Sequence, residues 1–155
     1  MHNLFNHIKK YIKIILFSIL SVFFVSSSNA ELSVEDIVKS RQALFSKNYS
    51  TAKRVQAFSS KGDFEKAKKL MLEMSENYTV LIDLFPENTQ EGFDTGALLT
   101  IWDEKDEFNA LMAKASDDMM KLTSVIEDAE DIRGTLKKFM WSNCKACHSR
   151  YREEH

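Results

Sequence analysis

The chain has 155 residues, 44% of them hydrophobic, and 21 Lys and Arg stand against 23 Asp and Glu. This length suits one domain with its own core. The formal charge of −2 gives no indication of a nucleic acid or an anionic membrane as a partner.

The first thirty residues have the composition of an export signal. A basic start contains His7, Lys9, Lys10 and Lys13. An apolar run follows at residues 14–25, and residues 28–30 are small, as a cleavage site requires. A membrane-spanning helix needs about 20 apolar residues. We therefore expect a cleaved signal peptide at residues 1–30 and a mature domain at residues 31–155, with an uncleaved anchor as the alternative.

Helix-breaking residues are rare after this leader, which favours long helices. They are Pro86, Gly62, Gly92, Gly96 and Gly134. The first helix is expected from Ser33, an N-cap with Asp36 three residues later, to Ser59. A turn at residues 59–62 follows.

A second helix is predicted to begin after Asp63 as N-cap and to end before Pro86, since the residue preceding a proline is biased away from the helical region. Residues 85–100 are rich in turn-forming types and predict one long connection. Apolar residues at helical spacing then predict a third helix at residues 102–126.

The fourth helix is expected after an acidic turn at residues 127–131. Gly134 weakens it by about 1 kcal/mol relative to alanine, which obscures where it begins. Its inner face comprises Ile132, Leu136, Phe139, Met140, Cys144 and Cys147. Four amphipathic helices without a useful β pattern predict an all-α fold, an antiparallel four-helix bundle.

Residues 144–148 read Cys-Lys-Ala-Cys-His, the C-x-x-C-H attachment signature of a c-type haem. On a helix, Cys144, Cys147 and His148 share one face. Two thioethers to the haem vinyls and one imidazole on the iron can then form together. The sequence therefore predicts one covalently attached haem c, with His148 as the iron ligand.

Other uses of two cysteines remain open. A thioredoxin-like redox pair needs a βαβ context and more chain than the eight residues after Cys147. A zinc site needs four ligands. A structural disulfide would leave His148 unexplained. Because this kind of haem attachment takes place outside the cytoplasm, haem c also agrees with the leader, and we expect a periplasmic protein.

The haem signature lies at the end of the last helix, and other segments add to it. They are Val38-Lys39-Ser40-Arg41-Gln42, Ile101-Trp102 with Phe108, and Tyr151-Arg152. With these segments the chain resembles the cytochrome c′ family over residues 31–152, which implies a four-helix bundle. One departure is the acidic link at residues 127–130, which lacks the glycine expected there.

The resemblance implies roles for individual residues. His148 is the proximal iron ligand, and Cys144 and Cys147 are the thioether sites. Arg152 lies beside the proximal haem face, and Arg41 lies near the haem propionates, where a guanidinium can make a charge-assisted pair. Gln42 and Trp102 belong to the matching segments and are also expected to contact the cofactor. The alternative for each arginine is a solvated helix face.

The resemblance also places Phe45, four residues after Arg41, on the distal side of the iron. Similar low-spin carriers have methionine at this position. Phenylalanine has no donor atom, so a pentacoordinate iron that binds nitric oxide, and more weakly carbon monoxide, is expected. It also offers no hydrogen bond to dioxygen. The alternative is that Phe45 is simply a core aromatic, and the methionines of the mature chain are expected to be packing residues.

These expectations favour a binding protein that captures nitric oxide over an enzyme, because Phe45 supplies no acid or base for peroxidase chemistry. A one-electron transfer cytochrome is the alternative. The expected partners are a diatomic gas and possibly a redox protein. The resemblance further implies a homodimer through the first two helices, with a monomer as the alternative.

Overall fold

The computed structural model describes residues 32–154. The expected signal peptide at residues 1–30 and His155 lie outside the described residues. Four long helical stretches fill this range: α2 (Val34–Ser60), α3 (Phe64–Ile82), α5 (Lys105–Val125), and α6 (Ile132–Leu136) continued by η2 (Lys137–Trp141) and α7 (Ser142–Tyr151).

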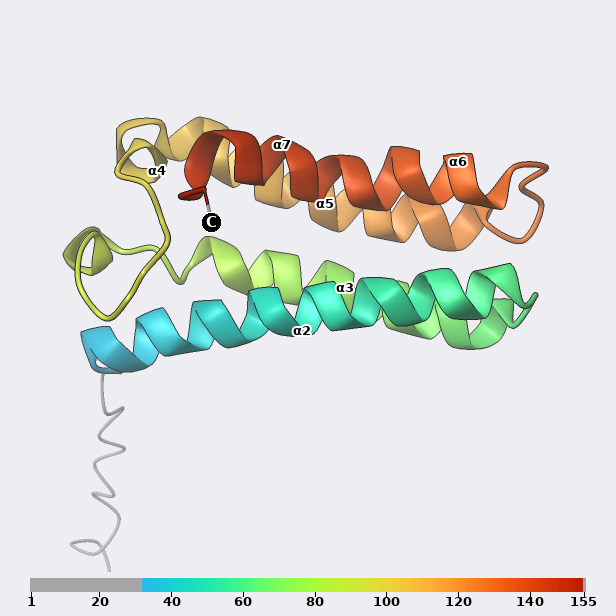
Figure 1. Cartoon of the computed structure of the whole chain (residues 1–155), viewed down its shortest axis with the longest axis horizontal. Coiled ribbons are helices and arrows are strands. Elements are labelled where there is room, and N and C mark those ends of the chain that lie inside the picture. Colours follow the sequence, from blue (N-terminus) through green and yellow to red (C-terminus); the bar gives the residue numbers. More distant parts are fainter. Residues whose placement is uncertain (1–31, 155) are drawn as a thin grey trace, which may run out of the picture. The chain divides into compact units, whose positions relative to one another are not determined.

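The four stretches form an antiparallel bundle of two layers (Figure 1). One layer contains α2 and α3, and the other contains α5 and the α6–η2–α7 stretch. The predicted all-α four-helix bundle is confirmed. Within residues 32–154, no helix is both long and apolar enough to cross a membrane.

The first two helices begin where their capping residues predict. The Ser33 side chain accepts a hydrogen bond from the Asp36 backbone N–H, and the Asp63 side chain accepts one from Lys66. Between the helices, Gly62 has a φ of 75°, a left-handed conformation that favours glycine. Local capping therefore fixes the tight α2–α3 connection.

The long connection contains the short helices η1 (Glu87–Thr89) and α4 (Thr100–Asp103). The third predicted helix is correspondingly split, because Glu104 leaves the helical conformation with φ −120° and ψ 44° between α4 and α5. The Arg41 guanidinium on α2 holds this connection. It donates to the Leu84 and Thr89 carbonyls and to the Thr89 and Thr95 hydroxyls.

The last helical stretch begins at Ile132, after the Asp131 side chain accepts a hydrogen bond from Gly134 N–H at 2.9 Å. A Cβ at position 134 would clash with Asp131 Oδ2, so a larger residue there would displace the capping carboxylate. Residues 137–141 form one π-helical turn, which the sequence analysis did not predict. It widens the helix immediately before the C-x-x-C-H segment.

The half of the bundle that holds the α2–α3 turn, here called the closed half, is filled by side chains. Its buried residues include Val55, Ala67, Met71, Met74, Met119, Leu122, Ile126 and Met140, each fully buried. Met71 and Met74 are thus packing residues, as expected. The other half, which holds the α3–α5 connection, is called the open half.

Candidate functional site

The open half contains a cavity of about 1060 Å³. The C-x-x-C-H side chains Cys144, Cys147 and His148 line it from α7. Phe45 lines it from α2, and Tyr78 from α3. Its volume is at the upper end of the range for small-molecule sites. The two layers of the bundle therefore enclose a site large enough for a macrocycle.

Both cysteines are free thiols in a nonpolar setting. Burial raises the pKa of Cys144 and raises that of Cys147 to about 12. The Cys144 thiol lies 3.8 Å from the Met140 carbonyl oxygen, one turn earlier in the helix. Both sulfurs therefore remain thiols at neutral pH, the form whose S–H adds across a vinyl group to give a thioether.

His148 lies where the cavity meets solvent and has Arg152 beside it, one helical turn later. Arg152 Nη1 is 3.4 Å from His148 Nδ1. Partial desolvation and then the Arg152 charge lower the pKa of His148, which favours the neutral imidazole that a metal requires. Arg152 also lines the cavity, so the structure brings these two predicted residues together.

Phe45 is half-buried and faces the cavity from the layer opposite α7 (Figure 1). Its ring packs edge-on against Phe85, with centroids 6.3 Å apart. Phe85 is held in turn by Phe108, at 4.7 Å. The aromatic cluster fixes a hydrocarbon surface across the cavity from His148.

Arg41 is 2% exposed and lines the cavity, although its hydrogen bonds go to the α3–α5 connection. Its guanidinium stacks over Phe85 at 4.5 Å, and no carboxylate pairs with it among the described residues. Burial lowers the pKa of Arg41 to about 10. A buried cation without an anion is costly, and a carboxylate-bearing ligand in this cavity would compensate it.

Gln42 and Trp102 were also predicted to contact the cofactor, and they differ in their position relative to the cavity. Gln42 lines the cavity and donates to the Asp94 carbonyl at 3.0 Å. Trp102 does not line it: its indole N–H donates to the carbonyls of Phe85 and Pro86 at 3.1 Å. The structure therefore places Trp102 behind the cavity wall, where it supports Phe85 and Arg41.

Tyr78, Met112 and Asn143 are among the cavity residues that the sequence did not mark as contacts of the site. Tyr78 and Met112 follow the ordinary apolar spacing of their helices, so nothing distinguished them from core residues. Asn143 precedes Cys144, and its amide donates to Asp118 Oδ2 at 2.9 Å and to the Phe139 carbonyl at 2.8 Å. This network anchors the start of α7 to α5. In the sequence, the indication of this role is an asparagine next to the C-x-x-C-H motif, at a position on the buried face of the helix where an apolar residue is expected.

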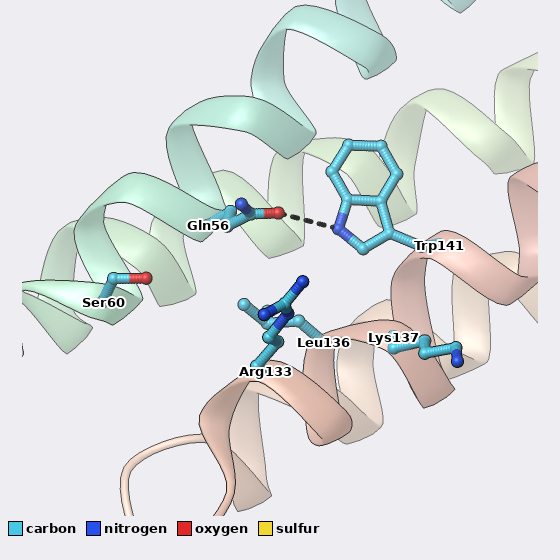
Figure 2. Close-up of a pocket in the computed structure, with 6 residues that line it drawn as sticks. All are labelled: Gln56, Ser60, Arg133, Leu136, Lys137 and Trp141. Atoms are coloured by element: carbon cyan, nitrogen blue, oxygen red, sulfur yellow. Dashed lines mark hydrogen bonds between the residues drawn. The ribbon is translucent and has the colours of Figure 1, made fainter.

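A smaller cavity of about 490 Å³ lies on the other side of Trp141, which lines both spaces (Figure 2). The indole N–H donates to Gln56 Oε1 at 3.0 Å and so connects η2 to α2. Arg133 and Lys137 give this smaller cavity a cationic wall. Trp141 therefore forms part of the wall of both the large cavity and the smaller cavity.

The residues of the large cavity fit a haem c. Two thiols and an imidazole on one helix face match vinyl attachment and iron ligation, and the interior is mainly apolar with a buried guanidinium at its edge. Within residues 32–154, no group of three or more His, Cys, Asp or Glu side chains could hold a metal ion by itself. The described residues therefore contain no cluster that could serve as a four-ligand zinc site.

The chain was compared with known proteins. The family model described as Cytochrome C' matches residues 36–152. A cytochrome c' of Rhodopseudomonas palustris is 26% identical over 131 residues, which cover 83% of this chain and 89% of that protein.

Solved structures are similar in fold. A structure of cytochrome c' from Rhodopseudomonas palustris gives a TM-score of 0.66 at 27% identity, covering 77% of this chain and 97% of that one. A nitric oxide complex of a variant of cytochrome c prime from Alcaligenes xylosoxidans gives a TM-score of 0.66 at 24% identity, covering 80% and 99%. At that lower identity the likeness concerns the fold alone.

Proposed function

The chain belongs to the cytochrome c′ family, and we propose that it is a periplasmic haemoprotein whose pentacoordinate iron captures nitric oxide and binds carbon monoxide. Proteins of this family bind covalently attached haem c. The observation that carries the proposal is Phe45, which presents hydrocarbon to the cavity across from His148. A phenyl ring cannot ligate iron, so that side stays free for a small ligand.

The chain's own residues have distinct roles in this proposal. Cys144 and Cys147 would hold the haem by thioethers, and the His148 imidazole would bind its iron. Arg41 provides a buried positive charge for a propionate, and Gln42 borders the same edge. Phe45 and the aromatic residues behind it exclude water and other side chains from the open axial position.

Two further observations support the proposal. A protein of the same fold, the cytochrome c prime variant from Alcaligenes xylosoxidans, has been obtained as a nitric oxide complex. The leader of residues 1–30 has the composition of a cleaved export signal, which supports the periplasm. Self-association through α2 and α3, as a homodimer, is part of the proposal, and the exposed Leu72 and Val80 on α3 are consistent with it.

Absorption spectroscopy of the ferrous haem-loaded protein tests the axial position. We expect a high-spin pentacoordinate spectrum that changes when carbon monoxide is added. A low-spin hexacoordinate spectrum before any addition would refute the proposal.

A second test introduces a side chain that can bind the iron on the side of Phe45. In Phe45→Met, a thioether sulfur replaces the ring, so the ferrous spectrum should become low-spin. Carbon monoxide affinity should fall about tenfold if sulfur ligation contributes about 1.4 kcal/mol. Phe45→Leu keeps a hydrocarbon side chain and should stay pentacoordinate.

Electron transfer is the second candidate function. Its supporting observation is Met112, a methionine that lines the cavity. However, Met112 comes from α5, which lies in the same layer as α7 (Figure 1). Electron transfer through a methionine-ligated iron would therefore need a ligand from the same layer as His148, whereas Phe45 of α2 comes from the opposite layer.

A further inference from the structure

Tyr78 is a buried phenol in the cavity. It lies on α3, is 5% exposed, and lines the space shared by Phe45 and His148. Among the described residues, the hydrogen-bond partner of its hydroxyl is Cys144 Sγ at 4.0 Å. Cysteine sulfur is a weak hydrogen-bond partner, so this long contact is weak.

When a haem vinyl attaches to Cys144, the S–H bond breaks, an S–C bond forms, and the hydrogen passes to the other vinyl carbon, so the sulfur becomes a thioether. A thioether sulfur is only a weak acceptor. The Tyr78 hydroxyl is then a buried donor without a good acceptor in the chain, which costs about 1–3 kcal/mol. Burial above all, and then Cys144, raise the pKa of Tyr78, so the group remains a protonated donor at any physiological pH.

The position of α3 determines which side of the cavity this donor serves. Both α2 and α3 belong to the layer that faces α7 across the bundle (Figure 1). Phe45 comes from α2 and Tyr78 from α3, whereas His148 comes from α7. Tyr78 therefore comes from the same layer as Phe45, and its hydroxyl reaches into the shared cavity as far as Cys144.

We propose that the Tyr78 hydroxyl donates a hydrogen bond to the diatomic ligand in this cavity and so sets ligand preference. This inference rests on the proposed function. It changes the expectation drawn from Phe45 alone, because the pocket then contains a polar donor as well as hydrocarbon. A ligand that carries negative charge on its outer oxygen is favoured over one that carries little.

Tyr78→Phe removes the hydroxyl and keeps the ring, so it is the sharpest test. Carbon monoxide is the probe, read by the C–O stretching frequency of the ferrous complex and by its dissociation rate. A donated hydrogen bond draws electrons toward the oxygen and weakens the C–O bond. We therefore expect the stretch to move to higher frequency in Tyr78→Phe and dissociation to become about fivefold faster.

Tyr49→Phe is the matched control. Tyr49 also lines the cavity, but it is 56% exposed, whereas Tyr78 is 5% exposed. Tyr49→Phe should therefore move the stretch and the rate much less than Tyr78→Phe does. Thermal melting of both haem-loaded variants separates a loss of packing from the loss of a donor, because packing alone would not move the stretch in the predicted direction.

The outcomes are distinguishable. If the wild-type ferrous protein binds no carbon monoxide, the proposed function fails, and this inference fails with it. If the wild type binds carbon monoxide and Tyr78→Phe has the same stretch and rate, the inference alone is overturned, and the hydroxyl serves the Cys144 sulfur. Equal shifts in Tyr78→Phe and Tyr49→Phe would also overturn it, since they would indicate a general change in cavity hydration.

Discussion

The closed and open halves of the bundle use the same four helices in different ways. In the closed half, Met71, Met119 and Leu122 are fully buried within the hydrophobic core. In the open half, the corresponding space is a cavity of about 1060 Å³. A side chain that faces a void loses the contacts that close packing provides. The open half therefore needs its cofactor, whereas the closed half is complete without one.

Buried polar groups are incompletely paired in both halves, and in the closed half the Ser59 hydroxyl has no hydrogen-bond partner among the described residues. Ser75 and Ser116, between α3 and α5, satisfy each other at 2.8 Å. In the open half, Arg41 has no carboxylate partner among the described residues, and Tyr78 has only a distant sulfur. Incomplete polar pairing beside a cavity marks a place where a ligand supplies the missing groups.

The largest expected effect comes from removing both attachment sites. Cys144→Ala with Cys147→Ala should abolish covalent haem, measured by haem staining after denaturing electrophoresis. In the haem-free protein, amide hydrogen exchange should quicken around Phe45 and Tyr78 and stay slow around Val55 and Leu122.

The single variant Cys144→Ala is the control for that experiment, since one thioether should still hold the haem on the gel. Staining of the double variant would contradict the assignment of these two cysteines. Uniform loss of protection along the bundle would contradict the independence of the closed half.

A smaller effect is expected from a cavity created in the closed half. Met119→Ala should lower the free energy of unfolding by about 2–5 kcal/mol, because Met119 is fully buried. Chemical denaturation measures this loss, and the carbon monoxide spectrum should stay unchanged. The neighbouring Met120 is 56% exposed, so Met120→Ala should cost less than about 0.5 kcal/mol. A similar cost for both variants would contradict the described core.

The smallest effect concerns the link between α2 and the α3–α5 connection. Thr89→Val removes the hydroxyl that accepts from Arg41 Nη1 at 2.8 Å. Since that nitrogen also donates to the Leu84 carbonyl, the expected cost is about 1 kcal/mol in chemical denaturation. Thr123→Val, whose hydroxyl bonds only its own helix, is the control. No difference between the two variants would show that Arg41 does not depend on Thr89.

Local signals predicted the helices well. Ser33 and Asp63 act as the caps that their positions indicated, and the first two helices end within a few residues of the expected bounds. The π-helical turn in the last helical stretch was not predicted. Leu136, Met140 and Cys144 have the ordinary i, i+4 spacing of one α-helical face, so nothing in this pattern indicates the π-helical turn at residues 137–141.

The sequence by itself determined the chemistry of the site, because Cys144, Cys147 and His148 are close along one helix and need only helical geometry to share a face. The tertiary structure decided which distant residues join them. It brought Tyr78 to the cavity and placed Trp102 behind the wall, and it directed Arg41 to Thr89, 48 residues away. Helical spacing shows which side of a helix is buried. Whether that side meets another side chain or a cavity depends on the distance between the two layers of the bundle. No local sequence pattern encodes that distance.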